Sequence, residues 1–453
     1  MWQKRSAHGR AGPKGEDGLH ASTITGMAEQ RQRRHLAARW IPPLLFDAVD
    51  FRRLWLGQTI SVFGDQITML GLPLVAVLVL GANATQMGYL TAAGLLPHLL
   101  FSLPAGVWLD RIRRRRRLMI AADLGRASLI ASIPVAYTLD SLGIAQLYVV
   151  GFLSGSLAVA FDLSWNTVFV SVTQRERYVE AMALLNGSRS LASVGGPTIG
   201  GWLVQLLGAP LAMLADAVSF IGSVLFLRRI ESPEPPIEHE VGGLRERLLA
   251  GLSFILRDPI MRPTLLAVAT INMFNFSFAA LFILYATTTL GVAPGILGVA
   301  LGTGAVGGVI GAVIASRIGR RIGLGRAYAL GCLVFPVPLI LVPIAGSVTA
   351  MPLILALLFA SEFGAGLGVM ILDINVGAII YARTPDRIRG RAGGAFRFIN
   401  YGIRPIGALV GGALGGALGV REALFVATIA TRAGVLWLAG SPVLRLHDLP
   451  EAG

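Results

Sequence analysis

An apolar stretch gives way to six arginines within the segment GVWLDRIRRRRRL, Gly106–Leu118. Arginines gather in the same way farther along the chain, with six in residues 228–262, four in 317–326 and four in 383–391. Around these segments we count twelve apolar stretches, from about Leu54 to Gly440, each long enough to cross a bilayer. Arg421 is the only basic residue in the opposite set of loops. Because arginine is enriched on the cytoplasmic side, this alternation predicts an even number of spans with both termini in the cytoplasm.

Composition excludes a soluble fold. The chain is 54% hydrophobic and only 14% charged, with a mean hydropathy of +0.68, which is far from the average of globular proteins. The net charge of +14 does not indicate a nucleic-acid partner, because the arginines are spread over loops that flank the apolar stretches. We therefore expect an all-α, multi-pass protein of the plasma membrane, surrounded by lipid and acting as a monomer, with twelve transmembrane helices in two six-helix bundles.

Two polar segments divide the chain. The first fifty residues hold Gly, Pro, Arg and Gln runs, which are typical of a disordered arm. The segment SPEPPIEHEVGG, Ser232–Gly243, interrupts the apolar pattern in the middle of the chain. The predicted units are a basic cytoplasmic tail (1–50), an N-terminal bundle (51–227), a cytoplasmic linker (228–262), a C-terminal bundle (263–441) and a second cytoplasmic tail (442–453).

The two halves are related by an internal repeat with an offset of roughly 206 to 211 residues. At this offset DRIRRR, beginning at Asp110, falls on SRIGRR, beginning at Ser316, and Asp162 falls on Asp373. Asp65 falls on Asn275, which has nearly the same shape without the charge. Two repeated six-span halves are a known plan of membrane transporters.

Glycine is concentrated in three of the predicted spans, the fifth (187–201), the eighth (298–311) and the eleventh (402–419). Small residues spaced four apart let helix backbones approach closely in a membrane. We expect these three spans, together with the second, to form the contact between the halves.

Several motifs resemble the major facilitator superfamily. GVWLDRIRRRRRL, Gly106–Leu118, is similar to the family's loop between the second and third helices, although Arg113 stands where a second Gly is usual. The segment GPTIGG is similar to the fifth-helix motif of proton-coupled exporters, here Gly196, Pro197, Gly200 and Gly201. FRRLWLGQTISVFGDQIT, RYVEAMALLNGSRSLASVGGP and TPDRIRGRAG resemble the branch of enterobactin-exporter-like and macrolide-efflux-like proteins. The resemblance implies a proton-coupled exporter that works by alternating access.

The loop motif supplies a candidate conformational latch, formed by Gly106, Asp110, Arg111 and Arg114. The Asp110 carboxylate could face the N-terminal end of the eleventh span and pair with an arginine of either half. Such a contact would hold the halves together on the cytoplasmic side. The alternative is that Asp110 lies in an ordinary loop facing the headgroups.

Acidic residues inside the spans indicate where protons could bind, because each costs about 3 kcal/mol or more at the bilayer centre and so faces a cavity or a partner. Asp65 lies on a polar stripe with Gln58, Ser61 and Thr68, roughly 16 Å into the membrane, and is our first proton-coupling candidate. A hydrogen-bonded structural carboxylate is the alternative. Glu362 is the second candidate, with a salt bridge to Arg397 or Arg404 as its alternative. We expect Asp162, Arg189 and Asp373 to be structural charges, whereas Asp216 could serve either role.

Aromatic and amide side chains on the central spans would suit an amphipathic organic substrate. The candidates for lining a substrate cavity are Phe63, Trp165, Asn166, Asn272 and Asn275.

The candidate classes of membrane protein are an ATP-driven pump, a polytopic membrane enzyme and a secondary active transporter. An ATP-driven pump needs a phosphate loop ending in Gly-Lys-Ser/Thr, and the lysines Lys4 and Lys14 do not provide one. A polytopic membrane enzyme, the alternative class, needs a catalytic or metal-binding cluster, and the sequence contains no HExxH, DDxxD or Cys/His cluster. We therefore predict a secondary active transporter, not an enzyme, with no metal and no cofactor beyond the proton gradient. Efflux of a drug-like, macrolide-like or siderophore-like compound is the favoured direction, and uptake of a small nutrient is the alternative.

Overall fold

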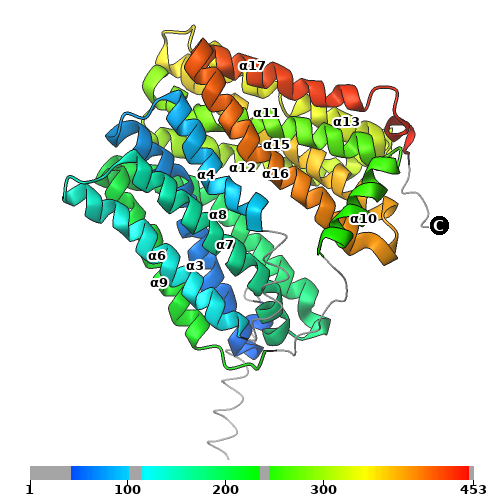
Figure 1. Ribbon diagram of the computed structural model, residues 1–453, viewed down its shortest axis with the longest axis horizontal. Coiled ribbons are helices and arrows are strands. Elements are labelled where there is room, and N and C mark those ends of the chain that lie inside the picture. The colour runs from blue at the N-terminus through cyan, green and yellow to red at the C-terminus, as the bar shows by residue number, and fades with distance from the viewer. Residues whose placement is uncertain (1–41, 102–113, 235–243, 448–453) are drawn as a thin grey trace, which may run out of the picture.

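The protein is described by a computed structural model over residues 42–101, 114–234 and 244–447 (Figure 1). Within these ranges the chain is helical and contains no strand. The first half consists of α2 (Leu44–Asp47), α3 (Val49–Leu74) with the π-helical turn η1 (Val75–Val79), α4 (Ala84–Phe101), α6 (Arg115–Thr138), α7 (Ile144–Val172), η2 (Arg175–Arg177), α8 (Tyr178–Leu207) and α9 (Ala209–Arg228).

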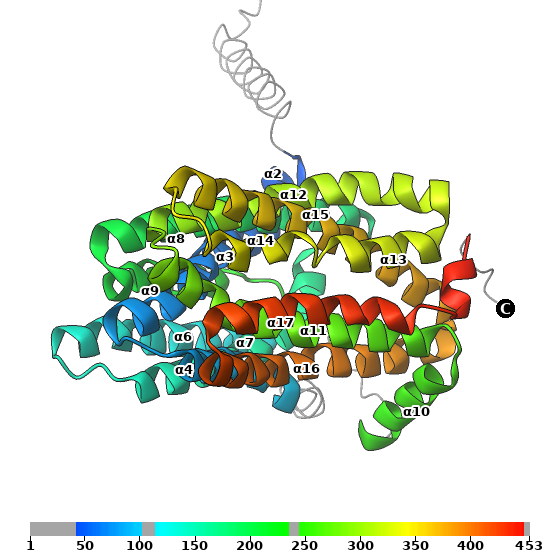
Figure 2. The ribbon, with the colours of Figure 1, turned by 90° about the horizontal axis from the view of Figure 1, so that it is seen from above.

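A linker helix, α10 (Leu244–Arg257), leads to the second half. That half consists of α11 (Met261–Leu284) with the π-helical turn η3 (Tyr285–Thr289), α12 (Pro294–Ile322), α13 (Leu324–Val334), η4 (Pro338–Ile340), α14 (Leu341–Ala345), α15 (Met351–Arg383), η5 (Asp386–Ile388), α16 (Arg389–Leu418), α17 (Val420–Arg432), η6 (Ala433–Trp437) and η7 (Pro442–Arg445). Figure 2, turned by 90°, shows the long helices running side by side.

Eight helices in the described part of the chain are long and apolar enough to cross a membrane. They are α3 with η1, α6, α7, α9, α11 with η3, α12, α13 through α14, and α15. The other long helices, α4, α8, α16 and α17, pack against members of this set. The predicted all-α membrane fold is therefore confirmed, whereas the count of twelve spans stays a prediction.

The internal repeat is visible in the irregular elements. The π-helical turns η1 and η3 begin 210 residues apart, at Val75 and Tyr285. The short helices η2 and η5 begin 211 residues apart. Gly208 and Gly419, also 211 residues apart, both have positive φ, +82° and +99°, and each separates two long helices at a turn that other residues rarely adopt. The two halves therefore fold in the same register, as the sequence repeat predicts.

The two halves meet through glycines at one end of the molecule. We call this the arginine-poor end, because its loops (80–83, 139–143, 290–293 and 346–350) lack arginine, and we call the other the arginine-rich end. There α8 packs against α12, where a Cβ on Gly201 would lie 3.1 Å from the Cα of Gly298. Likewise α4 packs against α16, where a Cβ on Gly88 would lie 2.7 Å from the Cα of Gly412. The prediction that the glycine-rich spans form the contact between the halves is confirmed.

Toward the arginine-rich end the two halves diverge (Figure 1). The helix pairs that join the halves, α8 with α12 and α4 with α16, make their closest backbone contacts near the arginine-poor end. Among the described residues, the close backbone contacts between the halves therefore lie toward the arginine-poor end, and the ribbons separate toward the arginine-rich end.

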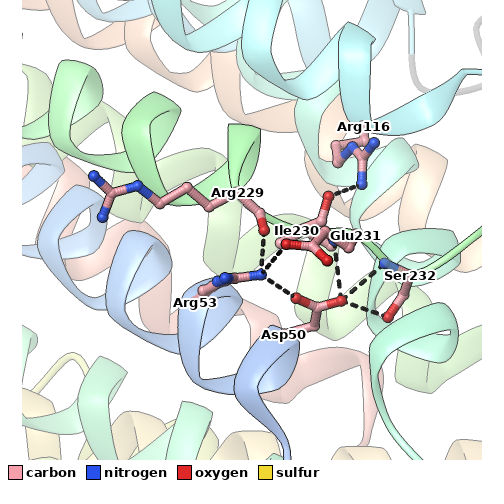
Figure 3. Close-up of polar contacts among 7 residues, drawn as sticks. All are labelled: Asp50, Arg53, Arg116, Arg229, Ile230, Glu231 and Ser232. Carbon is pink, nitrogen blue, oxygen red and sulfur yellow. Dashed lines mark hydrogen bonds and ion pairs between the residues drawn. The ribbon is translucent and has the colours of Figure 1, made fainter.

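The start of the linker is bound to the first half (Figure 3). Asp50 of α3 accepts hydrogen bonds from the Ser232 backbone N–H at 2.8 Å and the Ser232 hydroxyl at 2.7 Å. Arg53 donates to Asp50 at 2.8 Å and to the carbonyl of Arg229. Glu234 accepts from the backbone N–H of Arg115 at 2.6 Å, so a linker carboxylate caps the first turn of α6.

Some residues that the sequence analysis places in the two tails pack against the bundles. Leu44, placed in the disordered tail, belongs to α2, where it is 1% exposed and donates its backbone N–H to Glu180 at 3.1 Å. At the other end Val443 is buried in η7, and the Leu446 carbonyl accepts a hydrogen bond from Gly325 of α13 at 3.0 Å. Apolar residues flanking each bundle extend it, because burying them is favourable.

Candidate functional site

Four charged residues meet inside the first half, on three neighbouring helices. Asp65 lies on α3, Asp123 and Arg126 lie one turn apart on α6, and Asp216 lies on α9. Arg126 forms an ion pair with Asp65 through one guanidinium nitrogen and one carboxylate oxygen. The guanidinium carbon of Arg126 lies 4.1 Å from the ring centroid of Phe220, a favourable cation–π contact. The Asp65 side chain is 36% exposed and the Arg126 side chain 12%, so the pair is partly open to its surroundings.

Asp216 is fully buried but has hydrogen-bond donors. It accepts hydrogen bonds from the hydroxyl of Thr68 and from the hydroxyl of Ser219, the latter at 2.9 Å. Gly64 allows this approach of α3 and α9, because a side chain there would overlap with Asp216 and Ser219. Thr68, which the sequence places on the polar stripe with Asp65, therefore serves the neighbouring carboxylate.

Asp123 is also fully buried, yet its carboxylate is not satisfied. Neither of its oxygens has a hydrogen-bond partner by distance and angle among the described residues. The groups close enough to affect the protonation of the Asp123 carboxyl are the Ser223 hydroxyl, Arg126, Asp65 and Asp216. A buried carboxylate without a donor is costly in its ionised form, so the protonation of this group needs an explanation.

A cavity of about 790 Å³ lies where the second half faces the first. It is lined by residues of α3, α4, α8, α11, α12 and α15, and its wall is mostly apolar, with Phe278 and Phe282 among its aromatic side chains. Glu362 is the only titratable group among the lining residues, and Asn275, Ser190, Ser193 and Thr91 are its neutral polar members. Such a wall, apolar with a few placed polar groups, is typical of a site for a drug-sized molecule.

The predicted cavity residues are only partly brought together. Asn275 lines this cavity, and the other four do not. Trp165 is 9% exposed and stacks on Phe169 at 5.1 Å in the core of the first half, while its neighbour Asn166 is exposed on α7. Asn272 donates to the backbone carbonyl of Val268 at 3.0 Å, and Phe63 lies on α3 beside α8.

The two proton-coupling candidates have different surroundings. Asp65 is paired with Arg126, a residue that the sequence prediction did not include. Glu362 makes no hydrogen bond or ion pair with any residue in the described ranges, and Arg404 instead lies over the rings of Tyr401 and Phe276, at 4.1 and 5.0 Å. The alternative of a salt bridge between Glu362 and Arg397 or Arg404 is therefore not seen among the described residues.

The predicted structural charges form no ion pair with one another. Arg189 lies 5.7 Å from the ring centroid of Trp165, one turn from Asp162 on α7. Asp162 is exposed and interacts electrostatically with Arg126 and Arg189. Asp373, its repeat equivalent on α15, interacts electrostatically with Arg404. Their structural role stays a prediction.

The structure describes the whole fifth-helix motif but only one residue of the candidate latch. Gly106, Asp110 and Arg111 lie outside the described residues, and Arg114 is exposed just before α6. In α8, a Cβ on Gly200 would lie 3.2 Å from the Cα of Ile67 in α3. Gly196 packs on Gln66 of α3, whereas the Pro197 carbonyl and Gly201 pack on α12. The motif thus joins α8 to its own bundle and to the opposite one.

Two repeated helical bundles, a cavity between them and charges at membrane depth define a multi-pass membrane transporter rather than an enzyme. The chain matches the Major Facilitator Superfamily over residues 54–408 and belongs to this family. The multidrug efflux pump Tap of Mycolicibacterium fortuitum is 27% identical over 388 residues, which cover 80% of this chain and 88% of that protein.

Solved structures share the fold. A bacterial homologue of the iron transporter ferroportin in its inward-facing state has a TM-score of 0.72 at 17% identity, covering 86% of this chain and 98% of that one. The outward-facing state of a bacterial ferroportin homologue gives 0.54 at 18% identity, covering 87% and 98%.

Asp123 and Arg126 were missed by the sequence prediction. The signal available was a pair of opposite charges three residues apart inside an apolar segment, LMIAADLGRASLIA, Leu118–Ala131. Residues at that spacing share one helix face. Which helices that face meets is set by the tertiary packing.

Proposed function

We propose that this transporter exports an amphipathic organic compound from the cytoplasm in exchange for protons, by alternating access. The observation that carries the proposal is the Asp65–Arg126 ion pair, which lies deep in the first bundle and is partly exposed. Charges at such depth are costly and usually mark an ion or substrate pathway.

The direction is supported by the arrangement of the halves. By the positive-inside rule the arginine-rich end faces the cytoplasm, so the conformation described here opens to the inside. The two termini and the linker would then be cytoplasmic, in the plasma membrane. The Tap pump, a relative of similar length, is named for multidrug efflux, and export of such compounds is what we infer for this chain.

The cavity supports an organic substrate carrying a positive charge. Its wall is mostly apolar, and Glu362 is its one carboxylate. A cation held against an apolar wall near a single carboxylate gains both hydrophobic and Coulombic stabilisation. We assign Glu362 to the substrate and Asp65 to proton coupling.

In this mechanism Asp65 binds a proton from the outside once the transporter is open at the arginine-poor end, and this removes the charge that holds Arg126. The bundles would then be free to close at the glycine contacts of the arginine-poor end and to separate at the arginine-rich end. Substrate leaves to the outside, and the proton leaves Asp65 to the inside when the transporter returns.

The test measures the accumulation of ethidium, an amphipathic cation, in cells that produce the protein, with and without a proton uncoupler. We expect low accumulation that rises to the level of empty-vector cells when the uncoupler is added. Asp65→Asn should lose gradient-driven export yet keep ethidium counterflow in proteoliposomes. Asp140→Asn is the matched control, because Asp140 is exposed in a loop with φ of +50°, a conformation that Asn also accepts. Export that is insensitive to the uncoupler would contradict proton coupling.

A further inference from the structure

The first bundle contains more carboxylates than it can neutralise. Asp65, Asp123 and Asp216 share one arginine, Arg126, and two of the three acids are fully buried. Asp216 is stabilised by two hydroxyl donors. Asp123 has only the Ser223 hydroxyl nearby, which does not meet the distance and angle of a hydrogen bond, so its negative charge would be poorly compensated while Arg126 is paired with Asp65. The cost of such a charge in the protein interior is several kcal/mol.

Arg126 is placed to serve either carboxylate. It follows Asp123 by three residues on α6, so the two side chains leave the helix on the same face. Its Nε has no hydrogen-bond partner in the described part of the chain, which leaves a donor free. The guanidinium can therefore move from Asp65 on α3 to Asp123 on its own helix.

We propose that Asp123 holds a proton in this conformation and that Arg126 exchanges between Asp65 and Asp123 during transport. This assignment rests on the proposed function for its role in export, but not for the protonation itself. When Arg126 leaves Asp65 and pairs with Asp123, the O–H bond of Asp123 breaks and the proton binds Asp65. The charge of the cluster is the same before and after the exchange.

The exchange connects a buried proton to water. Asp123 is 0% exposed, whereas the Asp65 side chain is 36% exposed, so Asp65 is the more accessible acid and the one that we assign to release the proton. The remaining charges that face the cluster oppose ionisation of Asp123, since Asp65 and Asp216 are both acidic. Asp162 of α7 lies farther out and interacts with Asp65 and Arg126. The Ser223 hydroxyl and Arg126 favour the ionised form of Asp123, and Arg126 is the charged one of the two, which makes its position the switch.

Infrared difference spectroscopy of the purified protein in lipid nanodiscs at neutral pH tests this assignment without a substrate. A protonated carboxyl group absorbs at a C=O stretching frequency that a carboxylate lacks. We expect the difference spectrum of wild type minus Asp123→Asn to contain this band, and Asp123→Glu to shift it. Asp140→Asn, which removes an exposed carboxyl, should leave the band unchanged.

The variant Asp65→Asn distinguishes an Arg126 that exchanges between the two carboxylates from an Asp123 that is only a buried acid. In that variant Arg126 loses its present partner and pairs with Asp123, so the Asp123 band should disappear although Asp123 is intact. A band that survives in Asp65→Asn would overturn the exchange, and a band that survives in Asp123→Asn would overturn the protonation. If Asp123→Asn does not fold, the shift in Asp123→Glu decides the assignment. Failure of these spectra leaves the uncoupler test of export unaffected, so the two proposals fail separately.

Discussion

Adding one methyl group at Gly88 should push the two bundles apart at the arginine-poor end. A Cβ on Gly88 would lie 2.7 Å from the Cα and 3.1 Å from the N of Gly412, and 2.8 Å from the carbonyl oxygen of Ala408. Ordinary contact begins near 3.4 Å. All three atoms belong to the backbone of α16, so no side-chain rotation relieves the overlap. The helices must separate by several tenths of an ångström.

Overpacking of this kind costs about 1–3 kcal/mol. The cost applies only to the conformation in which α4 touches α16, so Gly88→Ala should shift the equilibrium toward opening at this end by about 5- to 150-fold. Gly94→Ala is the matched control on the same helix, since a Cβ there meets nothing within 4 Å. Replacing a helical glycine by alanine without a clash should stabilise the helix by about 0.5–1 kcal/mol.

The ratio of closed to open molecules can be measured with the pair Thr85→Cys and Gly416→Cys. A Cβ on Gly416 would lie 3.9 Å from the Cβ of Thr85, within the range of about 3.5–4.5 Å for disulfides. Molecules in which the two cysteines touch form the disulfide, whereas molecules open at this end are alkylated by an impermeant maleimide. A protease site inserted within 235–243 allows the chain to be cut, so that the two halves separate on a gel unless the disulfide joins them. The ratio of disulfide to alkylated product should fall with Gly88→Ala and hold with Gly94→Ala. Equal ratios in both variants would refute the closed glycine contact as the conformational lock.

Two further results are expected. Glu362→Gln should abolish export of cationic compounds while sparing neutral compounds of similar size, measured as accumulation in cells, because it removes the only carboxylate among the lining residues of the cavity; equal loss of both kinds would instead indicate a role in proton coupling. Reporter fusions or cysteine accessibility should place Pro236 in the cytoplasm and Ser347 outside, as the arginine distribution predicts, and a single side for both would contradict the predicted orientation.

Patterns that depend on one helix or on simple chain symmetry could be predicted from the sequence. Arginine asymmetry and apolar length predict the membrane fold, and the glycine spacing of four identified the helices that touch across the halves, as Gly201 with Gly298 and Gly88 with Gly412 show. Close backbone approach requires small residues wherever it occurs, so this signal does not depend on knowing the partner.

Sites that depend on which faces meet could not be predicted in the same way. Trp165 is a residue type expected in the wall of a cavity, yet its side chain packs on Phe169 inside the first bundle. Arg126 was overlooked because its partner, Asp65, lies 61 residues away on another helix. Helical spacing gives the face of a residue but not the helix that covers it. Tertiary packing supplies the rest.

The two halves share a fold but differ in charge, and this difference argues for a division of roles. The second-half helices that correspond to α3, α6 and α9 in the repeat are α11, α13 and α17. Asn275 replaces Asp65 in α11, and neither α11 nor α13 contains an acidic residue, while α17 has its one acid, Glu422, in the first turn. The second half therefore lacks a buried acid cluster on these helices and instead contributes most of the apolar cavity wall, including Glu362.

A proton bound in the first half can then bias the same opening and closing that a substrate in the cavity biases, because both halves must move together at the glycine contacts. Coupling needs no direct contact between proton and substrate, only that each prefers a different arrangement of the two bundles.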